Sequence, residues 1–217
     1  MGLSNVDKDY KKYLEQKDSR WEFGNMILYR MCQDYPNHNN EEEIVGKILL
    51  IGRTYAAAIE RRKTNDEIEG DDFYYEKVGP KMKLIGSELD RRLERLKEST
   101  NTIEEDLNDI LSTHKLLVDT FYEITGMNKR SLASKYLHFH CPEKFFIYDS
   151  RARNAIAKYV DKSDKGQYIE IKDCDQEYGD FVCRMIKLQK ELYKDLGTYE
   201  SPRKIDSFLL SYDRMRK

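Results

Sequence analysis

Hydrophobic positions recur along most of the chain at steps of three and four residues, which is the spacing of one face of an α-helix. The clearest stripe follows Asn40, a residue type that starts helices, and three glutamates that suit a first turn. Its members are Ile44, Ile48, Ile51, Tyr55 and Ile59. Similar stripes fill residues 21–31, 107–124, 178–196 and 205–212, whereas strand-like runs are short and isolated. The pattern therefore predicts an all-α protein of eight to ten helices, forming one compact domain over residues 1–217 with room for two helical lobes.

Local residue patterns mark where several of these helices begin. Thr102 and Glu105 have the spacing of a capping box, in which each side chain bonds to the backbone amide of the other residue. The same spacing recurs at Ser19. Ser201 followed by Pro202 is typical of an N-cap with proline at the first helical position. We therefore expect helices to begin near these three places.

Composition narrows the class of protein. The 217 residues are 39% hydrophobic and 36% charged, with 38 basic and 40 acidic residues and a net charge of −2. This balance excludes a uniformly basic, histone-like binder and a long acidic tail. No run approaches the roughly 20 apolar residues of a membrane span, and the first residues lack the apolar stretch of a secretory signal. The four cysteines form no Cys-x-x-Cys pair, so we expect free thiols in a reducing cytoplasm. We also expect no membrane partner and no cofactor.

Charge is unevenly distributed along the chain. Between Gly126 and Val160, seven lysines and arginines against two acids give a net charge of +5. Tyr136, Tyr148 and Tyr159 lie among them. Such a surface favours a phosphate backbone, because bound lysine and arginine side chains release counterions. The segment therefore predicts DNA as a partner, although an ordinary solvated face explains the same charge without one.

The basic segment opens with a tight turn between two predicted helices. Gly126 suits the left-handed residue that closes a helix, and Asn128 takes that conformation more readily than most residues. Met127 lies between them, and a second helix is expected from about Ser131, so residues 104–160 form a helix–turn–helix unit. Backbone amides at a helix start bind anions. The turn therefore predicts a phosphate site, and a bend that only redirects the chain is the alternative.

Asp149 is the candidate catalytic residue. It follows the apolar run Phe145–Tyr148 and precedes a predicted helix with Ala152 and Ala155 on its inner face. A carboxylate therefore lies at a predicted helix start, directly after an apolar run. A residue of this type at a helix start commonly serves as an N-cap, worth about 1 kcal/mol, with no chemistry involved.

Residues 123–160 resemble the helix-hairpin-helix DNA glycosylases of base-excision repair. The hairpin of that family has the pattern apolar-Pro-Gly-apolar-Gly-basic-Lys, and residues 124–130 are Ile-Thr-Gly-Met-Asn-Lys-Arg. In the family a catalytic aspartate follows the hairpin by about twenty residues, and Asp149 lies nineteen positions after Arg130. The resemblance implies a helical fold that binds DNA and excises a base flipped out of the duplex.

The departures from the family pattern bear on the chemistry. Thr125 and Asn128 stand where the family has proline and glycine, and Arg130 stands where lyase members have an imine-forming lysine. Because arginine stays protonated, the resemblance implies a monofunctional glycosylase. Cys174 and Cys183 do not reproduce the four-cysteine loop of some members, so no iron–sulfur cluster is expected.

The resemblance also assigns roles to individual residues. Asp149 would stabilise the sugar cation or orient a water molecule. The Gly126–Asn128 turn and Lys129 would hold a phosphate. Further contacts with the DNA backbone are expected from Arg130, Lys135, Arg151 and Arg153.

Other candidate pocket residues lie on either side of this unit. His138 and His140 precede Asp149 closely, but no partner cluster with zinc-like spacing exists, so no metal is expected. Arg53 and Tyr55 lie in a predicted helix beside three consecutive alanines, which permit close approach of another helix. The pocket candidates are therefore Arg53, Tyr55, His138, His140 and Tyr148.

Two functions from different classes follow. The leading hypothesis is a DNA-binding protein resembling base-excision glycosylases, with N-glycosidic hydrolysis centred on Asp149. The alternative is a catalytically inert helical interaction module, of a mobile-element or phage-defence type, that docks a protein partner through its basic segment. An acid in an aromatic-lined cleft facing the Gly126–Asn128 turn favours the first, and an acid that only caps a helix favours the second.

Overall fold

The computed structural model describes residues 6–16, 21–61, 70–161 and 173–212. Within these ranges there are ten α-helices, one short π-helical segment and no strand, which confirms the predicted all-α fold. The elements are α1 (Val6–Leu14), α2 (Glu22–Asp34), α3 (Glu41–Thr54), η2 (Tyr74–Val78), α4 (Gly79–Leu84), α5 (Gly86–Glu98), α6 (Leu107–Thr125), α7 (Arg130–His140), α8 (Ser150–Ile156), α9 (Gln176–Leu196) and α10 (Pro202–Tyr212). None of the described helices combines the length and apolarity needed to cross a membrane.

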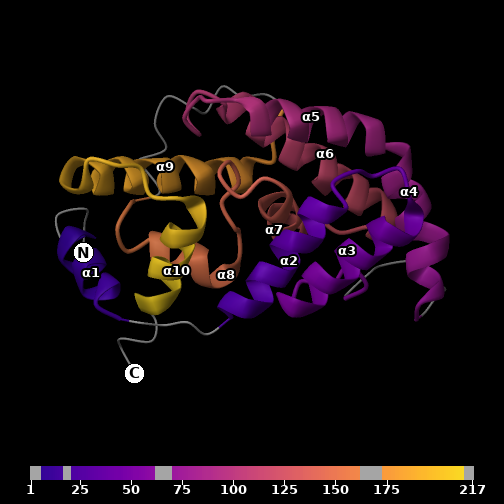
Figure 1. The fold of residues 1–217 in the computed structure, drawn as a ribbon, viewed down its shortest axis with the longest axis horizontal. Helices are drawn as coiled ribbons and strands as arrows, with labels where there is room; N and C mark the ends of the chain where they lie inside the picture. The colour runs from indigo at the N-terminus through magenta and orange to yellow at the C-terminus, as the bar shows by residue number, and fades with distance from the viewer. Residues whose placement is uncertain (1–5, 17–20, 62–69, 162–172, 213–217) are drawn as a thin grey trace.

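The helices form two groups that meet near the middle of the molecule (Figure 1). In one group α7 packs against α2, α3 and α6, and α6 pairs with α5. In the other group α8 packs against α9 and α10, while α1 contacts the same two helices. The loop between α7 and α8 passes from one group to the other and ends at Asp149. This topology places the candidate acid where the two groups meet.

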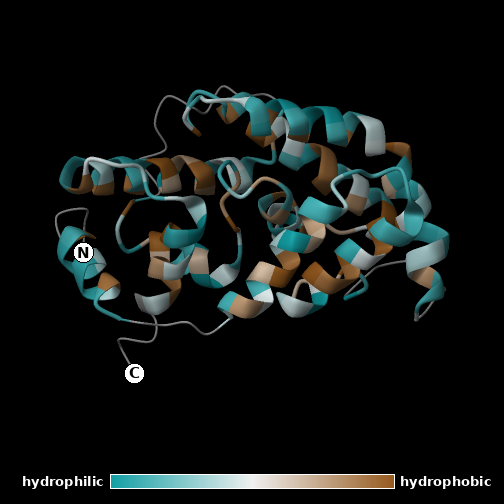
Figure 2. Cartoon of the chain, viewed as in Figure 1, coloured by the Kyte–Doolittle hydropathy of each residue, from teal (hydrophilic) through white to brown (hydrophobic). Residues whose placement is uncertain are grey.

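A single hydrophobic cluster runs through both groups, from Val6 in α1 to Leu209 in α10. Figure 2 shows the helices with hydrophobic stretches beside hydrophilic ones along their ribbons, as amphipathic helices require. The loop before α8 contributes Phe145 and Phe146, both fully buried. Each such side chain stabilises the fold by about 1.5–3 kcal/mol. Asp149 is therefore held by a segment anchored in the core.

Two predicted capping patterns are confirmed. The side chain of Asn40 accepts hydrogen bonds from the amides of Glu42, at 2.9 Å, and Glu43, at 3.4 Å. Thr102 and Glu105 form the reciprocal bonds of a capping box. Helix α6 nevertheless begins only at Leu107, because residues 103–106 form turns before it.

At the last helix the prediction also agrees with the structure. Ser201 precedes α10, which begins at Pro202, and its hydroxyl accepts a bond from the amide of Lys204 at 3.3 Å. Ser19 lies outside the described residues. The helix expected after it, α2, begins at Glu22.

The prediction of one helix over residues 44–59 is wrong at its end, because α3 stops at Thr54. Ala56 has a left-handed backbone, with φ of 52°, and the amide of Ala57 donates to the carbonyl of Gly52 at 2.7 Å. A Cβ at Gly52 would lie 3.1 Å from the Cα of Ala58. The small residues therefore let the chain reverse tightly over the helix end rather than receive another helix.

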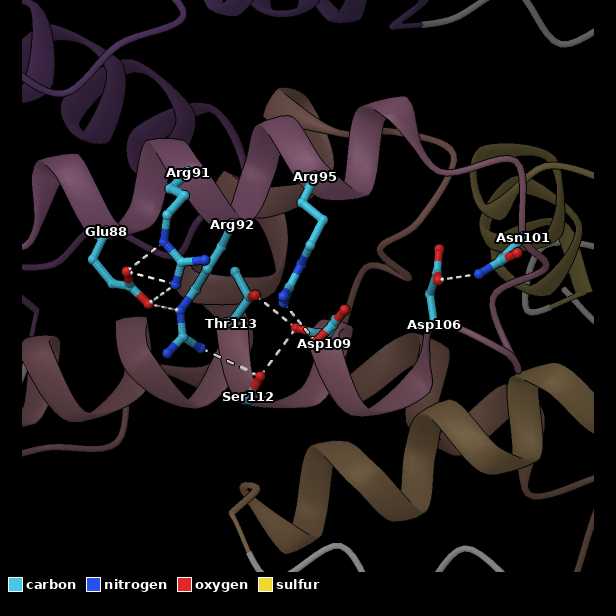
Figure 3. A network of polar contacts seen from close by, with 9 residues as sticks. All are labelled: Glu88, Arg91, Arg92, Arg95, Asn101, Asp106, Asp109, Ser112 and Thr113. Atoms are coloured by element: carbon cyan, nitrogen blue, oxygen red, sulfur yellow. Dashed lines mark hydrogen bonds and ion pairs between the residues drawn. The ribbon is translucent and has the colours of Figure 1, made fainter.

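Polar contacts join α5 to α6 along their exposed side (Figure 3). Arg92 bonds to Glu88 at 2.5 Å and reaches Ser112 on α6 at 3.3 Å. Arg95 pairs with Asp109 at 2.6 Å. Such partly exposed pairs contribute little individually. Together they link α5 to α6, and α7 packs against α6.

Candidate functional site

A cavity of about 830 Å³ opens where the two groups of helices meet. Its walls come from α1, the start of α2, the end of α3, α7, the loop before α8, α8 itself and α10. The volume is in the range of small-molecule sites. The lining side chains that matter for chemistry are Tyr55, Lys135, Tyr148, Asp149, Arg203 and Asp206.

Asp149 combines the two roles that the sequence left open, because it caps a helix and also lines the cavity. One oxygen, Oδ1, accepts the amide of Ala152 at 2.9 Å and caps α8. The other oxygen, Oδ2, lies 3.7 Å from the Nζ atom of Lys135. The side chain is 25% exposed, and the residue lines the cavity. The cap therefore fixes the carboxylate while leaving its second oxygen available to the cavity.

Lys135 is not the surface residue that the sequence predicts. Its side chain is only 2% exposed, and its amine donates to the hydroxyl of Ser131 at 2.7 Å. The amine also lies 5.8 Å from the ring centre of Tyr55. Burial lowers the pKa of Lys135, although the nearby carboxylates of Asp149 and Asp206 raise it. The prediction of a contact with the DNA backbone is therefore corrected, because the side chain is buried at the cavity wall.

Asp206 and Arg203 reach the cavity from α10 and were not predicted. Asp206 is 1% exposed, and its Oδ2 lies 3.0 Å from Nη1 of Arg203. Its Oδ1 is buried with no hydrogen-bond partner among the described residues. Burial raises the pKa of Asp206 to about 6, although Arg203 lowers it. The sequence offers one sign that Asp206 is buried, because this acid lies directly beside Ile205 in the apolar stripe of α10.

Aromatic side chains line the cavity as the sequence predicts for Tyr55 and Tyr148. The hydroxyl of Tyr55 donates to Asn25, and that of Tyr148 donates to Glu177. Burial raises the pKa of each phenol to about 12, so both are neutral near pH 7. Trp21, 67% exposed and with a left-handed backbone, also lines the cavity and was not predicted.

The turn before α7 is only partly as expected. Gly126 has φ of 68° and its amide donates to the carbonyl of Tyr122 at 2.7 Å, so it closes α6 as predicted. Asn128 does not take the left-handed conformation. The next helix begins at Arg130, one residue before the expected position.

The turn residues do not line the cavity. Gly126 and Asn128 are exposed, and Met127 is half-buried. The amine of Lys129 bonds to the carbonyl of Arg61 on a neighbouring loop. We predicted that an acid and this turn face each other across one cleft. Asp149 lines the cavity, but the turn does not. A phosphate site at the turn stays a prediction.

The predicted basic contacts divide into two kinds. Arg130 is held by Asp175 at 2.7 Å and by Glu177 at 3.1 Å, with its side chain 25% exposed. Arg153 also pairs with Glu177, at 2.9 Å, but lines the cavity together with the exposed Arg151. Arg151 and Arg153 are therefore better placed than Arg130 to meet an anion beside the cavity.

The two histidines are structural and lie outside the cavity lining. His138 bonds to the hydroxyl of Tyr29 at 2.6 Å and the carbonyl of Phe145 at 2.8 Å, and burial lowers its pKa to about 4. His140 is 4% exposed, beside the rings of His38 and Tyr136. Burial lowers its pKa well below the usual value. Both predictions of a pocket role are corrected, because these side chains pack inside the fold.

Arg53, the remaining candidate, is also outside the cavity. Its side chain is 53% exposed and pairs with Glu60 at 3.4 Å. Arg53 is in the last turn of α3 and faces solvent, whereas Tyr55, directly after the helix, lies at the cavity wall. Among the described residues, no group of three or more metal-ligating side chains could hold a metal ion.

Comparisons with protein-family models, with curated proteins and with solved structures found no match for this chain. The cavity and its charged side chains are therefore the features of the molecule that bear on its function.

Proposed function

We propose that this protein binds DNA and cleaves the N-glycosidic bond of a nucleotide flipped into the cavity. The observation that carries the proposal is the Asp149 carboxylate, fixed by the α8 cap and lining an 830 Å³ cavity beside the Lys135 amine. The resemblance of residues 123–160 to helix-hairpin-helix glycosylases supports the same reaction. The proposal places the protein in the cytoplasm.

The cavity has the chemistry that a base and its sugar require. Tyr55 and Tyr148 offer aromatic surface, and Arg203 and Asp206 offer a donor and an acceptor for the polar edge of a base. Basic side chains at the rim, Arg151 and Arg153, are available to the flanking phosphates. The cavity therefore combines an aromatic stacking surface, a polar end and a basic rim that attracts phosphates.

Asp149 acts on the sugar in this proposal. As the bond between C1′ and the base breaks, positive charge develops on C1′ and the ring oxygen. The Oδ2 atom of Asp149 stabilises that charge, and the N-cap bond to Ala152 keeps the carboxylate from rotating away. Because a fixed carboxylate needs no reorganisation during the reaction, its contribution appears in the rate of bond cleavage.

The test counts abasic sites, so the target base need not be known. Duplex DNA treated separately with an alkylating agent, an oxidant and nitrous acid is incubated with the protein, and new sugar aldehydes are labelled with an aldehyde-reactive probe. We expect labelling on at least one substrate, with Asp149→Asn slowing it by about 10²- to 10⁴-fold. Labelling that is equally fast with Asp149→Asn removes this residue from the reaction, and no labelling on any substrate overturns the proposal.

One observation favours the alternative of an inert interaction module. Phe23, Met26 and Ile27 on α2 are 73%, 51% and 47% exposed, and exposed apolar patches mark protein interfaces. This face of α2, in place of the basic segment expected from the sequence, would be the docking surface of such a module. It predicts a stable protein complex and no abasic sites in DNA, so the same labelling assay separates the two functions.

A further inference from the structure

We propose that the start of α2 binds single-stranded DNA, and that bases next to the nucleotide in the cavity stack there on the exposed rings of Trp21 and Phe23. These two residues are called the stacking platform below. The inference rests on the proposed function and names the form of DNA that the cavity accepts best. The platform adds contacts that only unpaired neighbouring bases can make.

Two aromatic rings lie in water at this end of α2. Trp21 is 67% exposed and Phe23 is 73% exposed. Trp21 lines the cavity, and Phe23 follows two residues later, outside the lining. Every base has a flat face that stacks on an exposed aromatic ring, whatever the sequence of the strand. The platform is therefore an aromatic surface that begins at the cavity and continues onto α2.

The backbone of Trp21 has a conformation that costs stability. Its φ of 73° is left-handed, which is rare for a bulky residue. Trp21 also precedes α2 without a side-chain hydrogen bond that caps the helix, although serine or aspartate would supply one at this position. Strained residues collect at sites where binding or catalysis needs them. The strain is therefore a second observation that marks Trp21 as functional.

The start of α2 is tied to the inside of the cavity. The side chain of Asn25 accepts a hydrogen bond from the hydroxyl of Tyr55, and its backbone amide donates to the carbonyl of Trp21 at 2.9 Å. All three residues line the cavity. A nucleotide that enters beside Tyr55 therefore leaves its neighbours in the strand close to the platform.

Exposed cations at the same cavity favour DNA over a protein partner. The side chains of Lys204 and Arg153 are 61% and 45% exposed, and Arg151 is exposed as well. All three line the cavity that Trp21 lines. A protein partner needs only the apolar face of α2, whereas a nucleic acid strand needs cations for its phosphates and rings for its bases. The structure offers both at one place.

Base pairing decides which form of DNA can use the platform. In a duplex each base is stacked between its neighbours, so the grooves present base edges rather than base faces. In a single strand the faces are free to stack on Trp21 and Phe23. Because each stacked base strengthens binding, we expect a single strand to bind about tenfold more tightly than a duplex of the same sequence at equal salt concentration.

The test uses the fluorescence of Trp21, which is the only tryptophan of the chain. Titration with a short oligothymidine should quench this emission, because a base stacked on an indole ring quenches its fluorescence. An oligomer of equal length with tetrahydrofuran in place of every nucleoside has the phosphates without the bases. It should bind through the cations and leave the emission nearly unchanged.

Two variants and a matched control separate stacking from stability. Phe23→Ala keeps the fluorescent reporter and should weaken oligothymidine binding about tenfold. Tyr35→Ala is the control, because Tyr35 is also an exposed aromatic residue but lies roughly 18 Å further along α2. Its affinity should equal that of the wild type. Trp21→Gly suits the left-handed backbone, so it should weaken binding without lowering the midpoint of thermal unfolding.

Quenching by oligothymidine, together with weaker binding for Phe23→Ala but not for Tyr35→Ala, supports the proposal. Unchanged emission overturns it, and so does tighter binding to the duplex than to the single strand. Wild-type affinity in Phe23→Ala also overturns it and leaves this face of α2 to a protein partner.

The same protein tested on treated DNA separates this proposal from the proposed function. If treated DNA gains abasic sites while oligothymidine causes no quenching, base excision stands and the platform is wrong. If oligothymidine quenches Trp21 but treated DNA gains no abasic sites, either as a duplex or after heat denaturation, the platform stands and the proposed base excision fails.

Discussion

Two charged side chains at the cavity wall are almost completely buried. Lys135 and Asp206 are both almost inaccessible, and the Oδ1 atom of Asp206 has no partner among the described residues. Burying charge without full compensation costs stability. Groups of this kind collect at functional sites, where binding or reaction needs them. They are therefore the strongest residue-scale support for a reactive cavity.

The pH dependence of stability should show the cost of Asp206. Its pKa is raised from 3.8 to about 6 in the folded state, so the native protein favours the protonated acid. The stabilisation is fully present below pH 3.8 and is lost as the pH rises through about 6. Urea unfolding of the wild type and of Asp206→Asn, measured from pH 4 to 7, should show the difference in unfolding free energy changing by up to about 1.4 kcal/mol per pH unit.

The direction of that change is the decisive part. The wild type should lose stability relative to Asp206→Asn as the pH rises from 4 to 7. A constant difference, or one of opposite sign, means that Asp206 does not hold a proton in the folded protein.

At the scale of the elements, α8 tests whether the two roles of Asp149 separate. Asparagine is as good an N-cap as aspartate, so Asp149→Asn should keep the bond to the amide of Ala152 and leave stability nearly unchanged. Asp149→Ala should cost about 1 kcal/mol of unfolding free energy. Thermal unfolding checks both variants, and a large loss for Asp149→Asn contradicts the separation of cap from chemistry.

The start of α5 gives a second prediction at this scale. A Cβ on Gly86 would lie 2.2 Å from the carbonyl oxygen of His38, so Gly86→Ala forces the backbones apart and should cost about 3 kcal/mol. Gly46 in α3 has nothing within 4 Å of its Cβ position. As a control, Gly46→Ala should raise stability by about 0.5–1 kcal/mol. Equal effects in denaturant unfolding contradict the close packing of α5 on the loop of His38.

The sequence predicted the elements well where the determinants are local. Asn40 and Ser201 bind amides within three residues, so their neighbours suffice to identify them. The end of α3 was missed because Ala56 and its neighbours keep the helical apolar spacing, and only the contact of Ala58 with Gly52 reveals the reversal. The cavity lining was predicted only for Tyr55, directly after α3, and for the segment that leads into α8. Side chains from α1, α2 and α10 line the cavity only because tertiary packing brings these helices to it, and a single sequence does not show that packing.

At the scale of the whole molecule, the basic side chains beside the cavity should govern DNA binding. Arg151 and Arg153 lie at the start of α8 and line the cavity, whereas Arg91 lies on α5, in the other group of helices. Affinity for duplex DNA should fall steeply with salt, and Arg151→Glu should weaken it and lower the salt slope by about 1. Arg91→Glu is the control and should have little effect. Fluorescence anisotropy at several salt concentrations measures both, and an equal loss for the two variants places the DNA elsewhere.

A crystal structure of Asp149→Asn bound to duplex DNA that carries a stable abasic-site analogue would show directly whether the cavity receives a nucleotide. We expect the analogue sugar inside the cavity between α7 and α8, with its C1′ atom facing residue 149 and the Lys135 amine. DNA bound on another face of the protein, with the cavity empty of sugar, would rule out base excision in this cavity.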